Sequence, residues 1–100
     1  MRICVKSPGS PKWRIVETMG GENSVKRVIK SNDYLLLEIS DKIGVVCNQN
    51  AYAQGMPFCC TFKKYRLYGT VAVVGLEDGK MTDISQKFED TLTKMLVPAV

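Results

Sequence analysis

Three short apolar runs constrain the fold of this 100-residue chain more than any other feature. They are Tyr34–Ile39, Ile43–Cys47 and Gly69–Gly75, the last of which has a glycine at each end. Apolar runs of about four to eight residues between turn residues are typical of buried strands, because buried helices are longer. Ser40–Lys42 is a tight turn, so the first two runs should pair as a hairpin. We expect Tyr34–Ile39 to be a central strand that is covered on both faces.

A second hairpin is predicted at the N-terminus. The run Arg2–Lys6 places Ile3 and Val5 on one face, which is the pattern of a strand. Lys12–Glu17 alternates basic and apolar residues in the same way. Between the two runs, Ser7–Pro11 contains two prolines and a glycine, and these residues favour a turn.

Two helices are also predicted. Glu22–Lys30 follows a pair of glycines and carries apolar residues at the spacing of one helical face. The second helix is expected to begin at Thr82 or Asp83, either of which can cap its N-terminus, and to end near Leu96. Its apolar residues recur at helical spacing: Ile84, Phe88, Leu92 and Met95.

This order of elements has more hairpins than crossovers, and it predicts an α+β fold. The expected architecture is a mostly antiparallel sheet of about five strands, with two helices packed on one face. The chain has an ordinary length for one domain, so residues 1–100 are expected to form a single domain.

Composition argues against several classes of protein. An apolar fraction of 45% is too high for a disordered chain, and the net charge of +4 is modest. No apolar stretch approaches the roughly 18 residues of a membrane helix, so we expect no contact with a membrane. The N-terminus is charged again within its first six residues, which does not fit a signal peptide. We therefore expect a cytoplasmic protein with reduced cysteines.

The chain contains no histidine. This excludes Ser-His-Asp and Cys-His catalysis, imidazole zinc sites and the usual acid–base group near neutral pH. An enzyme would have to work through cysteine, lysine or carboxylate groups. No Gly-x-Gly-x-x-Gly or Gly-Lys-Ser/Thr motif is present, so no nucleotide cofactor is indicated. The sequence disfavours catalysis and predicts no cofactor.

Cysteine chemistry is the remaining route to an enzyme. Cys47, Cys59 and Cys60 lie close in sequence and could form a thiol or metal site. Adjacent cysteines do not match the spacing of zinc sites, however, and we favour two strand residues that point to opposite faces. Lys63 and Lys64 are the visible cations that could lower the pKa of a thiol here.

No hydrophobic period holds from Asn48 to Arg66, and this stretch is long for a loop in a compact domain. Its length indicates either a functional loop or short elements that the pattern does not reveal. It begins with an amide-rich segment that contains Asn48, Gln49, Asn50 and Gln54. Amide side chains commonly lock loops by bonding to the backbone, and this structural role is favoured. The alternative is that they form directional hydrogen bonds with a partner.

The end of the same region combines cations with aromatic rings. Lys63, Lys64, Tyr65 and Arg66 are consecutive, and Tyr52 precedes them in the loop. Nucleic-acid surfaces use this combination, but no known nucleic-acid-binding signature accompanies it. Because the net charge is modest and no continuous basic helix is present, a protein partner is favoured over nucleic acid.

Several motifs resemble a family of small bacterial proteins carried by phages, plasmids and transposons, known only as domain of unknown function 3846. The shared motifs are Val46–Gln49, Gly55–Pro57, Tyr68–Gly75 and the opening Val5–Gly9. The family pattern continues with Asn-Arg soon after Gly-x-Pro, whereas this chain has Phe58-Cys59-Cys60. The resemblance implies an accessory protein of a mobile genetic element and supplies no catalytic residue.

Together these observations favour a non-catalytic binding or regulatory protein of a mobile genetic element. It would recognise a protein partner through the region 48–66, and the alternatives are nucleic-acid contact or a cysteine-dependent enzyme. Exposed strand edges would permit a dimer. The candidate binding residues are Asn48, Gln49, Asn50, Tyr52, Gln54, Lys63, Lys64, Tyr65 and Arg66.

Overall fold

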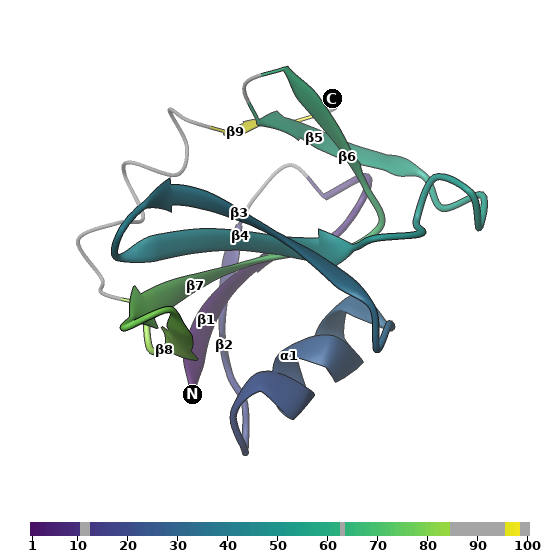
Figure 1. The fold of residues 1–100 in the computed structure, drawn as a ribbon. Coiled ribbons are helices and arrows are strands. Elements are labelled where there is room, and N and C mark those ends of the chain that lie inside the picture. Colours follow the sequence, from purple (N-terminus) through teal and green to yellow (C-terminus); the bar gives the residue numbers. More distant parts are fainter. Residues whose placement is uncertain (11–12, 63, 85–95, 99–100) are drawn as a thin grey trace.

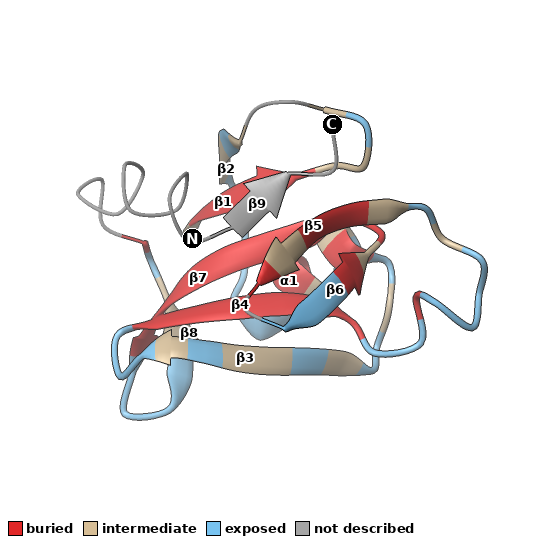
Figure 2. Ribbon diagram, turned by 90° about the horizontal axis from the view of Figure 1, so that it is seen from above, coloured by how far each residue is buried: buried red, intermediate tan, exposed pale blue. Residues whose placement is uncertain are grey.

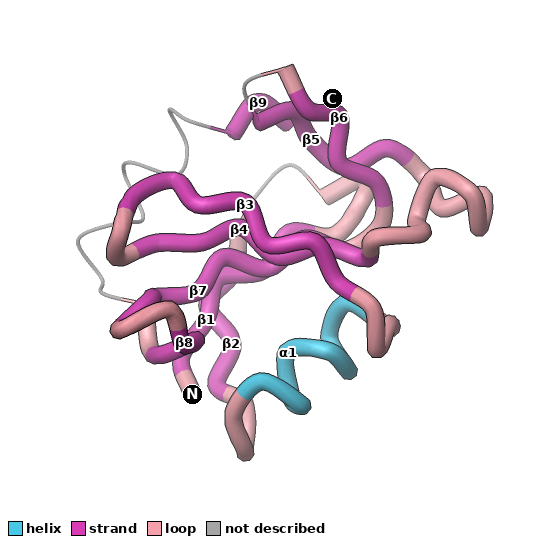
Figure 3. The backbone as a smooth tube through the Cα atoms, viewed as in Figure 1, coloured by secondary structure: helices cyan, strands magenta, loops and turns pink. Residues whose placement is uncertain are grey.

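Two antiparallel sheets and one helix make up the described part of the protein (Figures 1 and 3). The computed structural model describes residues 1–10, 13–62, 64–84 and 96–98. The main sheet contains β1 (Arg2–Lys6), β2 (Arg14–Glu17), β3 (Tyr34–Ser40), β4 (Ile43–Asn48), β7 (Val71–Glu77) and β8 (Lys80–Thr82). The second sheet contains β5 (Phe58–Phe62), β6 (Tyr65–Tyr68) and β9 (Leu96–Pro98), and the helix is α1 (Glu22–Ile29).

The strand order of the main sheet is β2-β1-β7-β4-β3, and β8 pairs with β7. The second sheet has the order β6-β5-β9. Figure 1 shows α1 on one side of the main sheet and the second sheet on the other side. The main sheet is therefore the middle layer of three.

Strict alternation along β7 explains how one sheet fills two cores. Val71 and Val73 pack in the core against the second sheet, while Ala72 and Val74 pack in the core against α1. Successive residues of a strand point to opposite faces, and both faces of β7 are covered. All four side chains are therefore fully buried. Figure 2 shows the buried residues concentrated in β1, β4 and β7. The sequence of a strand that is covered on both faces is therefore a continuous apolar run.

Most predicted strands and the first helix are confirmed. β1 and β2 form the N-terminal hairpin, β3 and β4 form the next hairpin, and α1 begins at Glu22 as expected. The helix ends at Lys30, which adopts a left-handed conformation with a φ of 60°. No helix of the described residues is long and apolar enough to span a membrane.

The predicted α+β class with two helices is wrong. The fold is mostly antiparallel sheet, and the described residues contain one helix. The second helix was expected to begin at Thr82 or Asp83. Thr82 pairs with Gly75 in the β7–β8 hairpin, and the Asp83 carboxylate accepts a hydrogen bond from the backbone N–H of Arg2. Leu96, where this helix was expected to end, pairs with Phe62 in the second sheet. Residues 85–95, between these strands, lie outside the described residues.

One further expectation needs correction. β3 is an edge strand of the main sheet and not a central one, because β4 is its only neighbour among the described residues. The region 48–66 contains short elements, which was one of the two possibilities for it, since β5 and part of β6 lie there. A bulge interrupts β5 at Cys59, since Phe58 pairs with Tyr68 and Cys60 pairs with Leu67.

Candidate binding site

A small hollow lies where the end of β4, the following loop and two edge strands meet. β3 contributes Leu35, and β6 contributes Tyr65–Tyr68. The end of β4 and the loop contribute Cys47–Gln49, Ala51 and Tyr52. The volume of this hollow is about 140 Å³. We call it the tyrosine pocket.

Exposed apolar side chains gather at the tyrosine pocket. Among the described residues, four large hydrophobic side chains are exposed, and three of them line it. Tyr52 is 76% exposed, Tyr65 is 42% exposed and Leu35 is 39% exposed. The fourth, Met19, does not line the pocket. Exposed apolar groups that gather in one place point to an interaction site more than scattered ones do.

Aromatic contacts hold Tyr52 in place although it lies in a loop. The Tyr52 and Tyr68 rings meet edge to face, with their centroids 5.1 Å apart. The Phe58 ring packs on Tyr68 with a centroid distance of 5.6 Å. Such pairs add about 0.5–1.5 kcal/mol beyond the burial of their area. The ring of Tyr52 is therefore presented to solvent in a fixed position.

Arg66 is the charged residue that lines the tyrosine pocket. Its guanidinium carbon lies 4.3 Å from the centre of the Phe58 ring. Its Nε donates a hydrogen bond to the hydroxyl of Tyr68 at 3.2 Å. These contacts fix the plane of the guanidinium group, because one holds its face and the other holds one edge.

The buried amide of Asn48 locks the loop that carries Tyr52. Its Oδ1 accepts a hydrogen bond from the backbone N–H of Asn50 at 2.9 Å. Its Nδ2 donates to Oε1 of Gln54 at 2.9 Å and contacts Sδ of Met56 at 3.6 Å. Gly55 then adopts a φ of +74°, so the Gly-x-Pro turn requires a glycine. The side chains of Asn48 and Gln54 therefore have a structural role in the loop, and Asn50 takes part through its backbone.

Replacing Asn48 by alanine should lower the free energy of unfolding by about 1–3 kcal/mol, because buried groups lose their partners. Gln49 is the matched control, since it is an adjacent amide with an exposed side chain. Gln49→Ala should change the free energy by less than about 0.5 kcal/mol. Urea unfolding followed by circular dichroism measures both values. Equal losses in the two variants would contradict the structural role of Asn48.

The structure brings together five of the nine predicted binding residues. Asn48, Gln49, Tyr52, Tyr65 and Arg66 line the tyrosine pocket. Asn50 and Gln54 support its loop, as described above, and Lys63 lies outside the described residues.

Lys64 is exposed, and its ammonium lies 5.8 Å from the centre of the Tyr65 ring. Leu35, Phe58 and Tyr68 also build the site and were not predicted for it. Tyr68 could have been predicted from the sequence, because alternation along β6 places it on the same face as Arg66. Nothing in the sequence signals that Leu35 joins them.

The cysteines lie in the core and not at the surface. Cys59 and Cys60 are both fully buried in the core between the two sheets. The expectation that they point to opposite faces is wrong, because the bulge at Cys59 breaks the alternation. All four cysteines are free thiols. Among the described residues, no three Cys, Asp or Glu side chains are arranged to hold a metal ion.

The cation next to Cys59 is Lys6 and not Lys63 or Lys64. Lys6 is 1% exposed, and its Nζ donates to the carbonyl of Cys59 at 3.3 Å. The thiol of Cys59 donates in return to the carbonyl of Lys6 at 3.5 Å. The hydrogen bond from Cys60 lowers the pKa of Cys59, and the charge of Lys6 lowers it further. Lys6 belongs to β1 and Cys59 to β5, so this contact lies between the main sheet and the second sheet.

Cys47 is the one cysteine that lines the tyrosine pocket. Burial raises its pKa to about 11, and the proximity of Cys59 adds to this effect. The side chain is therefore a neutral thiol at neutral pH, which is a poor nucleophile.

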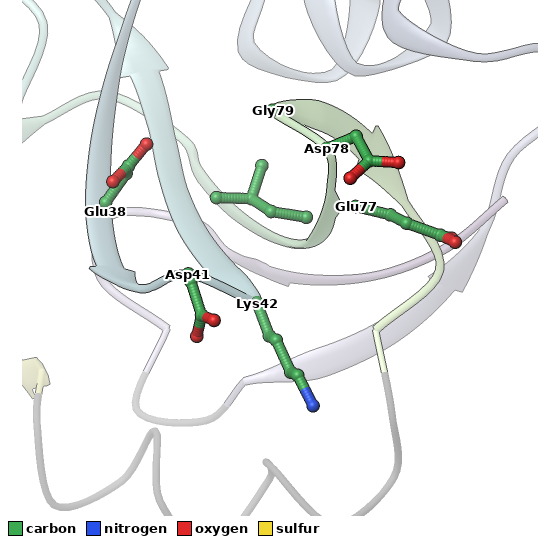
Figure 4. Close-up of a pocket in the computed structure, with 7 residues that line it drawn as sticks. Glu38, Asp41, Lys42, Glu77, Asp78 and Gly79 are labelled. Atoms are coloured by element: carbon green, nitrogen blue, oxygen red, sulfur yellow. The ribbon is translucent and has the colours of Figure 1, made fainter.

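An acidic hollow of about 440 Å³ lies near the turn between β7 and β8. Glu38, Asp41, Glu77 and Asp78 line it (Figure 4), and all four side chains are exposed. Figure 4 shows that these carboxylates point in different directions and do not converge on one point. The hollow therefore gives its surface a negative potential without forming a cation site.

Comparison with known proteins found one family. The family described as Domain of unknown function (DUF3846) matches residues 1–97. No curated protein and no solved structure matches the chain significantly.

Proposed function

The chain belongs to the family Domain of unknown function (DUF3846), and we propose that it is a non-catalytic module that binds a protein partner through the tyrosine pocket. The observation that carries this proposal is the gathering of exposed Tyr52, Tyr65 and Leu35 around one fixed arginine, Arg66. Tyrosine and arginine are enriched at the residues that contribute most to binding in protein interfaces.

The size of the tyrosine pocket favours an anchoring side chain over a small-molecule ligand. Pockets that enclose cofactors or drug-sized ligands usually have volumes of about 300–1,000 Å³. The tyrosine pocket has about 140 Å³, and a cavity of roughly 150 Å³ holds one benzene ring. One side chain of a partner therefore fits it, and a nucleotide or flavin does not.

The rigidity of the site also favours binding. Asn48 and Gln54 lock the loop before any partner arrives, and Tyr68 fixes Tyr52. A preformed surface loses less conformational entropy on association, which favours affinity. Catalysis through Cys47 is disfavoured, because its raised pKa leaves a neutral thiol. The further proposal of an accessory role in a mobile genetic element depends on the motif resemblance alone.

Site-specific photo-cross-linking tests the proposal. A benzophenone amino acid replaces Tyr52 in one variant and Met19 in the other, since both positions are exposed and only Tyr52 lines the tyrosine pocket. We expect the Tyr52 probe to capture a defined protein from host lysate, and we expect Tyr65→Ala to abolish this capture. The Met19 probe should not capture the same protein.

Two outcomes would contradict the proposal. Capture of the same proteins by both probes would show that the tyrosine pocket is not the binding surface. A cross-linked product that nuclease removes, together with retention on heparin lost in Arg66→Glu, would favour nucleic acid instead. Asn48→Ala is a poor probe here, because Asn48 is buried and supports the loop.

A further inference from the structure

Arg66 presents an open fork of hydrogen-bond donors at the tyrosine pocket. Its Nε bonds to Tyr68 and its face stacks on Phe58. Its two terminal nitrogens have no hydrogen-bond partner among the described residues, and the side chain is exposed. The terminal nitrogens of such a guanidinium group can donate two hydrogen bonds to one carboxylate, and its fixed plane reduces the entropy lost on binding.

The charge around this fork favours an acidic ligand. No carboxylate lines the tyrosine pocket, and Lys64 lies beside Tyr65 at its rim. The acidic side chains Glu38 and Asp41 lie toward the other end of β3. Leu35, at the pocket, precedes Glu38 by three residues, which is about 10 Å along a strand. A ligand that follows β3 therefore meets Arg66 at the tyrosine pocket, and it meets Glu38 and Asp41, with Lys42 beside them, toward the other end. Asp33 precedes β3 at the near end and does not line the tyrosine pocket.

β3 offers a backbone edge directly beside the tyrosine pocket. It is seven residues long, and its only neighbour among the described residues is β4. Figure 2 shows β3 along one side of the main sheet, with no described strand outside it. Leu35 belongs both to this edge and to the lining of the tyrosine pocket. An extended peptide can add to such an edge and place one side chain in an adjacent pocket.

We infer that the partner presents an acidic extended segment, whose backbone pairs with the edge of β3 while one of its carboxylates pairs with Arg66. This inference depends on the proposed function, because it specifies the chemistry of the segment that the tyrosine pocket binds. The segment carries its acidic residue opposite the Leu35 end of β3. It carries no acidic residue about three positions away, where Glu38 would repel it.

Selection from a phage library of random linear peptides tests the inference, with the Tyr52→Ala variant as the counter-screen. We expect peptides that require Tyr52 to share an aspartate or glutamate at one position. Arg66→Gln should weaken binding of the consensus peptide by about ten- to hundredfold, as measured by fluorescence anisotropy. Lys80→Gln is the matched control, because Lys80 is exposed but does not line the tyrosine pocket.

A double-mutant cycle separates the carboxylate pair from other effects. Replacing the acidic residue of the peptide by its amide should weaken binding to the natural protein by the same factor. It should not weaken binding to Arg66→Gln any further, because the pair is already lost. Hydrogen exchange of the amides in Tyr34–Ser40 should slow when the peptide binds, because strand addition protects the edge.

The outcomes distinguish the inference of an acidic extended segment from the proposal that the tyrosine pocket binds a protein. Peptides that require Tyr52 but neither Arg66 nor an acidic residue would overturn the inference and leave the proposed function standing. Failure to select any peptide that requires Tyr52 would count against the proposed function itself. Unchanged exchange in β3, a dimer that protects β3 without peptide, or competition by single-stranded DNA would each overturn the inference.

Discussion

Gly75→Ala is expected to lower the free energy of unfolding by roughly 3 kcal/mol, because an added methyl group would collide with backbone atoms. A Cβ at Gly75 would lie 2.3 Å from the carbonyl oxygen of Asp83 and 3.0 Å from its carbonyl carbon. Neither atom is the end of a flexible side chain, so a strand must shift to relieve the collision. Urea unfolding followed by the fluorescence of Trp13 measures the loss.

The segment around Asp83 cannot move away without losing other interactions. The Asp83 carboxylate accepts a hydrogen bond from the backbone N–H of Arg2 at 2.8 Å. The next amide, that of Ile84, donates to the carbonyl of Arg2 at 2.8 Å. Gly75 itself pairs with Ile43 on one side and Thr82 on the other. Relieving the collision would therefore disturb the hydrogen bonds of this segment with β1 and the pairing of β7 with β8.

Gly44→Ala is the matched control for Gly75, because Gly44 is also buried in the main sheet. A Cβ at Gly44 would meet the ends of the Leu36 and Leu76 side chains, and the nearest of these atoms is Cδ1 of Leu36 at 2.6 Å. Because these side-chain ends can rotate away, we expect a loss of only about 1 kcal/mol. Similar losses in both variants would show that the approach of Asp83 to Gly75 does not limit the packing.

The apolar runs predict the strands of this fold, but they do not predict the position of each strand in the sheet. The runs of β3 and β4 look alike in sequence, yet β4 lies inside the sheet and β3 lies at its edge. Leu36 is partly buried against the core next to α1, and Leu37 and Ile39 are partly buried against the core next to the second sheet. An apolar run therefore shows that both faces of a strand have apolar neighbours. It does not show how many strands flank it.

The other two errors concern β5 and the helix that was expected after Thr82. The bulge at Cys59 turns two successive residues toward one core, so β5 shows no alternation. The apolar spacing after Thr82 predicts a helix, but Thr82 itself lies in β8 and pairs with Gly75, while residues 85–95 of that prediction lie outside the described residues. The partner of Thr82 is only seven residues away, across the tight turn at Asp78 and Gly79, and an Asp-Gly turn of this kind is a local signal for a hairpin.

The candidate site was predictable by residue type and not by position in space. Tyr52, Tyr65 and Arg66 are predicted because cations and aromatic rings are combined in this region of the sequence. Asn48 and Gln49 carry similar amides, and only the structure shows that Asn48 is buried and Gln49 is exposed. Leu35 joins the site because β3 and β6 both border the tyrosine pocket, and no sequence motif indicates this.

Lys6→Met is expected to raise the free energy of unfolding by about 1–3 kcal/mol, because it removes a buried ammonium group and keeps the bulk of its side chain. Lys6 is 1% exposed, and no carboxylate among the described residues pairs with its ammonium. The hydrogen bond to Cys59 compensates only part of the cost of removing a charge from water, a cost of several kcal/mol. Urea unfolding at neutral pH measures the change.

Two further variants separate charge from packing at this position. Lys6→Ala also removes the charge, but it leaves a cavity between β1 and β5, so it should be about 2–3 kcal/mol less stable than Lys6→Met. Lys42→Met, at an exposed lysine, should change stability by no more than about 0.5 kcal/mol. If Lys6→Met instead destabilises the protein, the ammonium is net stabilising, and its contact with Cys59 holds the two sheets together.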